Sequence, residues 1–243
     1  KGKKKDGNKY TDQAIDRGAS IAITDKIYGQ NNKKKIKVKN TFKFFTECSN
    51  LIRRSSNINC VAITGSSGKT TLKEMVGQLL NKIYKTYYSK KSYNNKFGVP
   101  LSLFNIKKKD RLGIFEVGMD KKGEISYLTK IIQPNIGVIT NISYAHIKNF
   151  KDLEGIAKAK SEIIDNIVKG GTAILNADDS FFQYFKSKAI ANKLKIISFS
   201  QKKKSNVKFH KFKKKGVNNF IVVKLNEKPL DFLINQELAN NVD

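Results

Sequence analysis

The stretch "CVAITGSSGKTTLKEM", residues Cys60–Met75, decides how the chain folds. Its first part, Cys60–Thr64, is a short apolar run with β-branched residues, which predicts a buried strand. Its last part, from Thr70 onward to Leu80, spaces apolar residues as a helix does. A turn rich in Gly and Ser lies between the two parts. The sequence therefore predicts a strand, a glycine-rich turn and a helix in that order.

This turn is suited to holding phosphate. The backbone N–H groups of Ser66–Lys69 can converge on one anion, and the N-terminal end of the following helix adds a favourable dipole. Lys69 adds a charge for the outer phosphates, and Thr70 adds a hydroxyl for the Mg²⁺ that accompanies ATP. The usual P-loop has a Gly where this chain has Ile63, so only the shorter pattern Gly65–Thr70 remains. A plain turn would also need Gly, but the flanking strand and helix favour nucleotide binding.

From Asn57 onward, apolar runs typical of strands alternate with helical patterns. Such alternation predicts an α/β fold with a mostly parallel sheet flanked by helices, in which ligands collect at the carboxyl ends of the strands. Beyond Ser200, short extended runs broken by Lys and Asn predict an antiparallel extension. The expected strands are Val61–Thr64, Thr86–Ser89, Gly113–Val117, Ile136–Thr140, Thr172–Leu175 and Lys195–Phe199, and the expected helices are Thr70–Leu80, Val99–Phe104, Gly123–Ile131, Asp152–Val168 and Asp179–Ile190.

The first 56 residues are organised differently. The stretch "YTDQAIDRGASIAITD" predicts a helix to Arg17, a stop at Gly18 and a strand at Ser20–Thr24. The stretch "TFKFFTECSNLIRRSS" predicts a helix that closes this part. These few elements indicate the tail of an α/β domain whose beginning is absent. We therefore expect residues 1–56 to be a remnant of one domain and residues 57–243 to form the central domain.

The composition predicts a real core and a basic surface. The 243 residues are 39% hydrophobic, and the net charge of +28 raises nucleic acid as a partner. Specific contacts to bases and phosphates favour Arg, whereas nearly all of the positive charge here is Lys, spread through the whole chain. We interpret the charge as a solvated lysine surface and expect no specific nucleic-acid partner.

Cysteine usage and hydropathy bear on the compartment. Cys48 and Cys60 lack the spacing of a metal site, and a thiol in the apolar strand is typical of a reduced core. No apolar run approaches the ~20 residues that a membrane helix needs, and no charged-then-apolar leader is present. We expect a monomeric cytoplasmic protein without a membrane span.

Several polar residues stand where the expected strands end. Glu116 closes an apolar strand, where its carboxylate could meet the Mg²⁺ that Thr70 also touches, although a charged strand terminus can serve solubility alone. His146 follows another strand; a lone His is more often structural than a ligand. Asn94 and Asn95 lie in a turn before a helix, where they are either turn formers or uncharged groups that grip a substrate.

A second group of polar residues lies in the later part of the chain. Lys158 and Lys160 are two residues apart on a predicted helix and so face different ways. Lys160 shares the inward apolar stripe, and an inward lysine requires a partner or a modification. Asn176 closes a strand, and Asp178 and Asp179 after it can cap the next helix.

Six of these motifs occur in an order that resembles the Mur ligases: "TGSSGKTT", "YNNKFGVPLSL", "FEVGMDKKGEI", "HIKNF", "AKAKSEI" and "LNADD". The resemblance covers nearly all of residues 57–180 and is strongest to the branch that joins D-alanyl-D-alanine to UDP-N-acetylmuramoyl-tripeptide. The N-terminal "KGKKKDGNKYTDQAIDRGA" is similar to the later part of the family's UDP-sugar-binding domain. The resemblance implies that residues 57–243 are the family's central ATP-binding domain.

The resemblance also implies an activity and roles for residues. It implies an ATP-dependent ligase of peptidoglycan precursor synthesis that forms an amide through an acyl phosphate. It implies that Thr70 and Glu116 bind a first Mg²⁺, that His146 serves a second, and that Lys160 is carbamylated and binds metal as well. The implied catalytic residues are Lys69, Lys160, Asn94 and Asn95, and the implied nucleotide-binding residues are Gly65, Ser66, Ser67, Gly68, Lys69, Thr70, Thr71, Asn176 and Asp178.

The end of the chain departs from the family pattern. The family continues with a motif like Gly-x-His-Asn-x-x-Asn-Ala, whereas this chain reads "INQELANNVD", in which only Asn241 keeps its place. We expect the C-terminal ligase domain to be absent, and the chain to bind Mg-nucleotide without turning over as a ligase. The alternatives are another Mur-type amino acid ligase or folylpolyglutamate synthase, a P-loop-like nucleotide binder or kinase, and a basic nucleic-acid-binding protein.

Overall fold

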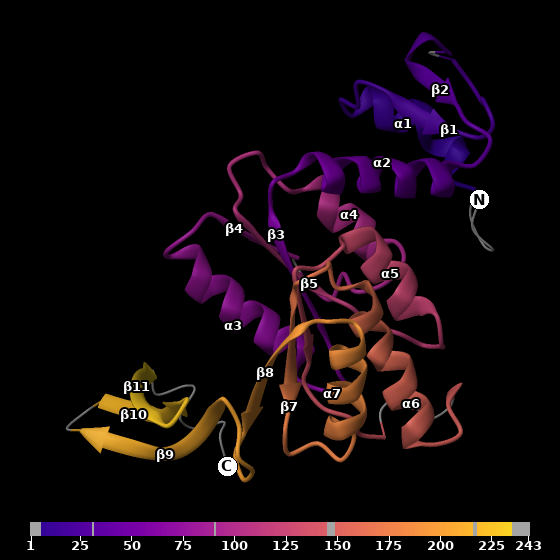
Figure 1. Ribbon diagram of the computed structural model, residues 1–243. Coiled ribbons are helices and arrows are strands. Elements are labelled where there is room, and N and C mark those ends of the chain that lie inside the picture. The colour runs from indigo at the N-terminus through magenta and orange to yellow at the C-terminus, as the bar shows by residue number, and fades with distance from the viewer. Residues whose placement is uncertain (1–5, 31, 90, 145–148, 216–217, 235–243) are drawn as a thin grey trace.

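The structure, a computed structural model, describes residues 6–30, 32–89, 91–144, 149–215 and 218–234. Within these residues a nine-stranded sheet runs through the molecule in the order β11-β10-β9-β8-β7-β6-β3-β5-β4 (Figure 1). The strands are β3 (Asn59–Thr64), β4 (Thr86–Tyr88), β5 (Leu112–Glu116), β6 (Ile136–Ile139), β7 (Thr172–Asn176), β8 (Lys195–Ser200), β9 (Val207–Lys215), β10 (Asn218–Leu225) and β11 (Lys228–Ile234).

The sheet is parallel from β4 to the start of β9 and antiparallel from β9 to β11. The predicted α/β fold with a mostly parallel sheet and a short antiparallel extension is therefore confirmed. β9 joins the parallel part through only two pairs, Phe199 with Val207 and Ser200 with Lys208. The three antiparallel strands extend away from the helices as an arm (Figure 1).

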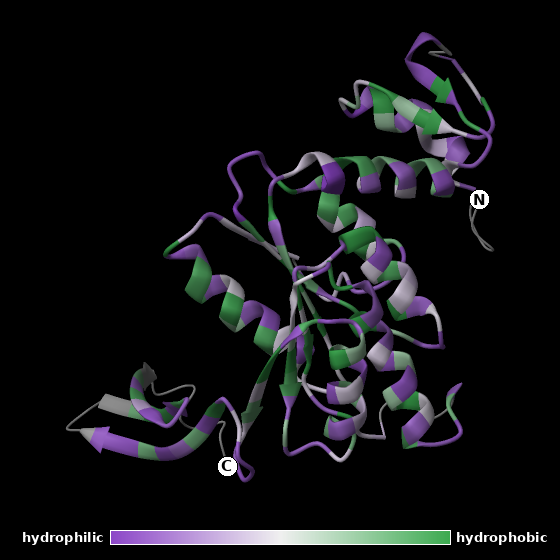
Figure 2. Cartoon of the chain, in the orientation of Figure 1, coloured by the Kyte–Doolittle hydropathy of each residue, from purple (hydrophilic) through white to green (hydrophobic). Residues whose placement is uncertain are grey.

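Helices cover both faces of the parallel part (Figure 1). Alternation along β3 sends Ile63 to one face, where it packs with Leu72 and Val76 of α3, and Cys60 and Ala62 to the other, larger core. Figure 2 shows hydrophobic residues along these central strands and hydrophilic residues along much of β9. The helices are α3 (Lys69–Asn81), α4 (Gly98–Phe104), α5 (Glu124–Ile132), α6 (Leu153–Lys160), the 3-10 segment η4 (Ser161–Asn166) and α7 (Phe182–Ala191).

The N-terminal part forms a small unit of its own. Strands β1 and β2 pair in parallel as a separate two-stranded sheet, and the buried amine of Lys35 lies 2.6 Å from the carboxylate of Asp12. The long helix α2 then connects this unit to the central sheet. The elements are η1 (Gly7–Tyr10), α1 (Thr11–Asp16), β1 (Ala22–Thr24), η2 (Asn32–Lys34), β2 (Lys35–Lys37) and α2 (Thr41–Ser55).

α2 is held against the central part by rings and by one buried arginine. The rings of Phe45 and Phe104 stack with their centroids 5.2 Å apart. Arg53 donates its Nε hydrogen to the carbonyl of Ile132 (2.5 Å) and its Nη2 hydrogen to that of Gln133 (2.9 Å), at the end of α5. These bonds occupy carbonyls that a helix terminus leaves without helical partners.

Two predicted helix boundaries were wrong. The predicted helix Asp152–Val168 is α-helical only to Lys160 and continues as η4, where Glu162 accepts backbone hydrogen bonds from Gly123 (2.8 Å) and Ser126 (3.0 Å) at the start of α5. The helix expected to begin at Asp179 begins at Phe182. None of the helices in the described part of the chain is long and apolar enough to cross a membrane.

Candidate active site

The glycine-rich turn between β3 and α3 has a conformation that its glycines permit. Gly65 has φ +150° and Gly68 has φ +77°, a region that residues with side chains rarely adopt. A Cβ at Gly65 would lie 1.8 Å from Oγ1 of Thr140, at the end of β6. The turn therefore needs glycine at position 65 both for its backbone angle and for this close approach, and α3 begins directly after it at Lys69.

Asn141 holds two amides of this turn. The backbone N–H of Ser66 donates to the carbonyl of Asn141 (2.9 Å), and the N–H of Ser67 donates to its side-chain Oδ1 (3.1 Å). The hydroxyl of Thr140 donates to the carbonyl of Ser67 (2.7 Å). The end of β6 thus forms one wall of the predicted phosphate cradle, and an anion reaching these amides would replace Asn141.

Two lysine amines meet at a single carbonyl of the cradle. Nζ of Lys69 and Nζ of Lys160 each donate to the carbonyl of Gly65 at 2.8 Å, and Lys69 also reaches the carbonyl of Ser66 at 3.3 Å. Lys160 is only 1% exposed, which confirms that it faces inward, whereas the side chain of Lys158 is 57% exposed. The cradle therefore holds two lysine amines side by side, one from each of two helices.

Burial changes how these two amines ionise. Burial, followed by the repulsion of Lys69, lowers the pKa of Lys160 to about 7. Burial also lowers the pKa of Lys69, although the carboxylate of Glu116 acts in the opposite direction. Near neutral pH a large fraction of Lys160 is therefore an uncharged amine, the form of lysine that reacts as a nucleophile.

Glu116 is the carboxylate at the centre of the site. It is 2% exposed at the end of β5, and its Oε2 accepts a hydrogen bond from the hydroxyl of Thr70 (2.7 Å). Its Oε1 accepts a hydrogen bond from Nδ2 of Asn94 (2.8 Å). The fold thus brings together Thr70, Asn94 and Glu116, which are far apart in the sequence, at the carboxyl edge of the sheet.

The loop before α4 supplies both predicted asparagines. The carbonyl of Asn94 accepts the N–H of Gly118 (2.9 Å), which fixes this loop beside the end of β5. Oδ1 of Asn95 accepts the N–H groups of Phe97 and Gly98 (3.0 Å each) and so caps the start of α4. Asn94 therefore contacts the carboxylate of Glu116, whereas the side chain of Asn95 bonds the backbone at the start of α4.

Asn176 and Asp178 differ in what they contact. Nδ2 of Asn176 donates to the carbonyl of Thr140 (3.1 Å), beside the cradle wall. The carboxylate of Asp178 instead accepts backbone N–H groups from Gln201 (2.6 Å) to Lys203 (3.0 Å), in the turn after β8. Burial acts to raise the pKa of Asp178, but these backbone bonds outweigh it and hold the pKa below its usual value. The expectation that Asp178 caps the following helix was wrong, because its oxygens face this other turn.

Two other predicted site residues contribute less to this picture. Thr71 is exposed on the first turn of α3. His146, the expected second-metal residue, lies outside the described residues. The sequence predicted no role for Asn141, and its position directly after the predicted strand Ile136–Thr140 was the one signal that could have assigned it to the cradle.

A pocket of about 870 Å³ opens from these groups toward the N-terminal unit. At its outer rim Phe42 of α2 meets Phe97 edge to face, with centroids 5.2 Å apart, and Nζ of Lys96 lies 5.4 Å from the Phe97 ring. The pocket is lined by Phe42, Lys69, Asn94, Asn95, Lys96, Phe97, Glu116, Gly118, Met119, Asp120, Lys121, Lys122, Gly123, Glu124, Tyr127, Leu128 and Lys160. Its inner end holds Lys69, Asn94, Glu116 and Lys160, and its outer end is aromatic and basic.

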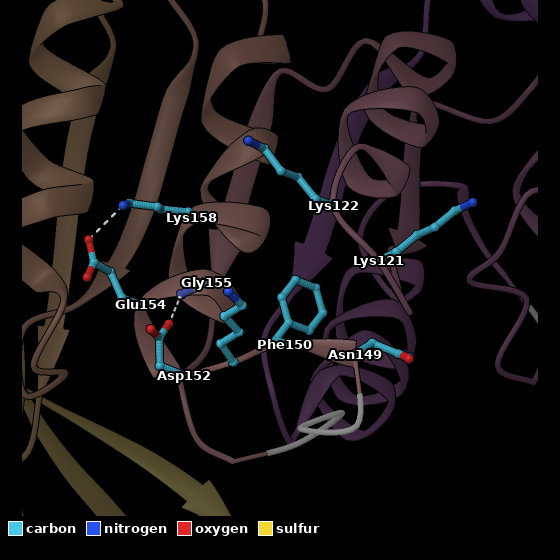
Figure 3. Close-up of a pocket in the computed structure, with 9 residues that line it drawn as sticks. Lys121, Lys122, Asn149, Phe150, Asp152, Glu154, Gly155 and Lys158 are labelled. Carbon is cyan, nitrogen blue, oxygen red and sulfur yellow. Dashed lines mark hydrogen bonds and ion pairs between the residues drawn. The ribbon is translucent and has the colours of Figure 1, made fainter.

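A second, open hollow of about 550 Å³ (Figure 3) shares Lys121 and Lys122 with the first pocket. Its acids are already engaged: Glu154 pairs with Lys158 at 2.7 Å, and Asp152 accepts the N–H of Gly155 at 2.7 Å. Its other charged residues are lysines, which could attract an anion. None of the predicted site residues lines it.

The family model described as the Mur ligase middle domain matches residues 63–236. The chain belongs to the Mur ligase family. A curated Mur ligase from Buchnera aphidicola (subsp. Baizongia pistaciae), named UDP-N-acetylmuramoyl-tripeptide–D-alanyl-D-alanine ligase, is 38% identical over 207 residues, which are 85% of this chain and 45% of that protein. One of the same name from Rickettsia prowazekii is 36% identical over an alignment of 245 positions, gaps included, which covers 98% of this chain and 54% of that protein.

Solved Mur ligase structures agree with this assignment. A crystal structure of MurF from Acinetobacter baumannii has a TM-score of 0.85 and 27% sequence identity, and the match covers 99% of this chain and 52% of that one. MurF from Thermotoga maritima in complex with ADP matches with a TM-score of 0.80 at 24% identity, over 96% of this chain and 53% of that one. The chain spans about half the length of the curated relatives it matches.

Proposed function

We propose that this chain is part of an ATP-dependent ligase that joins D-alanyl-D-alanine to UDP-N-acetylmuramoyl-tripeptide, the two substrates that the names of its relatives give for those proteins. The observation that carries the proposal is the contact of Glu116 with Thr70 and Asn94, where Glu116 and Asn94 line one pocket together with Lys69 and Lys160. We further propose that residues 1–56 belong to a UDP-sugar-binding domain and residues 57–243 to the central ATP-binding domain.

The proposed reaction has two steps. The terminal carboxylate of the tripeptide attacks the γ-phosphorus of ATP, so that an acyl phosphate forms and ADP leaves. The amine of D-alanyl-D-alanine then attacks the acyl carbon, loses a proton and expels phosphate, which leaves the new amide. In this chain the cradle amides and Lys69 bind the phosphates and offset the charge that shifts between them. Asn94 and Asn95 line the pocket where the carboxylate would approach.

The residues present fit Mg²⁺. The hydroxyl of Thr70 and the carboxylate of Glu116 are hard oxygen donors already 2.7 Å apart, and Mg²⁺ in nucleotide sites commonly takes one or two such protein ligands together with phosphate oxygens. A bound Mg²⁺ would offset negative charge on the phosphates. No group of three or more His, Cys, Asp or Glu side chains gathers within the described ranges. We also propose that His146, which lies outside the described residues, and the carbamate of Lys160 bind a second metal ion.

Lys160 fits a role as a carbamate. An uncharged lysine amine can attack CO₂ and lose a proton, which replaces a positive group with a carboxylate-like one. The lowered pKa of Lys160 supplies the uncharged amine near neutral pH. The change would also remove the repulsion between Lys160 and Lys69 at the carbonyl of Gly65.

We place the reaction in the cytoplasm and assign it to a monomer. Cys48 and Cys60 are free thiols, as a reducing compartment allows. A nucleotide-binding protein without ligase activity is the second candidate, favoured by the cradle alone. It would have no use for a buried lysine beside the phosphates, which is the observation that separates the two.

The test is a calorimetric titration of this chain with a non-hydrolysable ATP analogue and Mg²⁺, at low and high salt. We expect saturable binding that requires the metal, survives high salt and weakens at least a hundredfold in Lys69→Ala. Lys82→Ala, at the exposed far end of α3, removes the same charge outside the cradle and should bind as the wild type does. Equal loss in both variants, or binding that salt abolishes in all three proteins, would leave only the general lysine surface.

The acyl substrate distinguishes the ligase from the simple nucleotide binder. UDP-N-acetylmuramoyl-tripeptide should bind the same chain, and Lys160→Met should weaken that binding or its dependence on nucleotide. Mass spectrometry of the intact chain in bicarbonate, beside Lys160→Met, should show a CO₂ adduct on the wild type alone. Nucleotide binding without any acyl-substrate binding would favour the second candidate.

A further inference from the structure

Lys73 is a buried lysine that the proposed reaction does not use. It lies on α3 one turn after Lys69 and is 0% exposed. A lysine with no exposed surface is uncommon, because the amine must recover inside the protein the hydrogen bonds that it made with water. Its three bonding partners therefore indicate what the residue is for.

All three partners of the Lys73 amine are oxygen atoms. Its Nζ donates to the carbonyl of Ser89 (2.5 Å) and to the carbonyl of Lys91 (2.7 Å), and lies 2.9 Å from the carboxylate of Glu74. An ammonium has three hydrogens to donate, so these oxygens satisfy it completely. Two of the three belong to the backbone between β4 and α4, and only Glu74 comes from its own helix.

The backbone that Lys73 holds leads directly to the site. Lys91 has φ +53°, a left-handed conformation that is unfavourable for a residue with a side chain and persists where surrounding contacts fix it. A few residues later Asn94 donates to Glu116 and accepts from Gly118. This loop is therefore fixed at its start by Lys73 and at its end by the edge of β5.

The contact of Lys73 bears on the site because Lys73 lies on the same helix, α3, as Lys69 and Thr70. The helix begins at Lys69 and carries Thr70, which contacts Glu116, so Lys73 and the phosphate cradle belong to one rigid element. A hydrophobic residue would fill the same space without a buried charge. The hydrogen bonds of the amine fix the distance between the helix that carries the cradle and the loop that bears Asn94.

We propose that Lys73 is a positioning residue, which holds the Asn94–Asn95 loop at a set distance from the phosphate cradle and so couples the nucleotide side of the pocket to the acyl-substrate side. This inference rests on the proposed ligase function for its substrate. Lys73 touches neither substrate nor phosphate in this account. It acts through Asn94 and Asn95, which line the pocket.

The test compares Lys73→Met with Lys73→Arg and with Glu74→Gln in the same chain. Glu74→Gln removes only the partner on the same helix and leaves both loop carbonyls bound. In Lys73→Met we expect affinity for the ATP analogue with Mg²⁺ within about threefold of wild type, and affinity for UDP-N-acetylmuramoyl-tripeptide at least tenfold weaker. Lys73→Arg should recover part of the loss, and Glu74→Gln should bind both ligands as the wild type does.

Hydrogen exchange makes the test independent of the substrate. The amides of Asn94 and Gly118 should exchange at least tenfold faster in Lys73→Met, whereas the amides of β3 should not change, which also shows that the variant folds. Unchanged exchange in the loop, or equal weakening of nucleotide and acyl-substrate binding, would overturn the inference. If the wild type binds no acyl substrate, the proposed function fails, and the exchange rates still decide whether Lys73 holds the loop.

Discussion

The parallel centre and the antiparallel end of the nine-stranded sheet differ in what they contribute to the site. At its parallel centre, β3, β5 and β6 are covered by helices on both faces, and their carboxyl ends carry the cradle, Glu116 and Asn141. At the antiparallel end the arm leaves Phe212 46% exposed and Phe232 52% exposed, and none of the site residues lies there. Hydrogen bonding between neighbouring strands continues through the whole nine-stranded sheet, but it does not by itself create a site. Parallel strands do, because all their carboxyl ends meet at one edge between covering helices.

Matched phenylalanines test this comparison most strongly. Phe185 on α7 is 1% exposed in the main core, whereas Phe212 on the arm is 46% exposed. Phe185→Ala should lower the free energy of unfolding by about 3–5 kcal/mol because it leaves a cavity. Phe212→Ala should lower it by about 1–2 kcal/mol, since a residue that is 46% exposed buries only about half of its surface. Urea unfolding of both variants measures this, and equal losses would show that the arm contributes as much as the core.

Gly65→Ala should be the next largest effect. The new methyl would need φ +150° and would meet Oγ1 of Thr140, so we expect a loss of roughly 2–3 kcal/mol together with loss of nucleotide binding. Gly170→Ala is the control, because Gly170 has φ +75° with nothing within 4 Å of a Cβ. It should cost about 1 kcal/mol and leave nucleotide binding unchanged. Binding retained in Gly65→Ala would show that the cradle tolerates a shift of β6.

The pH dependence of stability should reveal Lys160. Its folded pKa of about 7 lies below the ordinary lysine value of 10.5, so between these values the unfolded chain binds more protons than the folded one. The group therefore makes stability rise with pH across that window, by at most about 1.4 kcal/mol per pH unit. Thermal unfolding from pH 6.5 to 9.5 in buffer free of CO₂ and metal should show a flatter curve for Lys160→Met. The exposed neighbour variant Lys158→Met should keep the wild-type slope, and identical slopes for Lys160→Met and wild type would contradict the lowered pKa.

The smallest expected effect concerns the connection between the two regions. Asp178→Asn weakens the bonds that hold the turn after β8, and should cost about 1 kcal/mol at neutral pH with little change in nucleotide affinity. Since the folded pKa of Asp178 is depressed, this contribution is present above the unfolded pKa and is lost as pH falls through the folded value. A tenfold loss of nucleotide affinity with unchanged stability would instead place Asp178 in the nucleotide site, as the family resemblance implies.

Local pattern was a good guide to the elements and a poor one to their partners. The strand before the cradle and the helix after it are where the apolar spacing placed them, and the inward stripe correctly buried Lys160. The same spacing extended α6 too far, because the segment after Lys160 turns to offer Glu162 to the start of α5. That contact joins residues 36 to 39 positions apart in the sequence, and periodicity contains no record of it.

The sequence by itself determined the order of strands and helices, the glycine-rich turn, the basic surface and the family resemblance, because these depend on residues close together along the chain. Only the tertiary structure decided that Glu116 contacts both Thr70 and Asn94, that Asn141 closes the cradle, and that Lys69 and Lys160 share one carbonyl. The physical reason is the parallel sheet. It brings the ends of distant strands to one edge, where burial and the close approach of charges set the chemistry of each group.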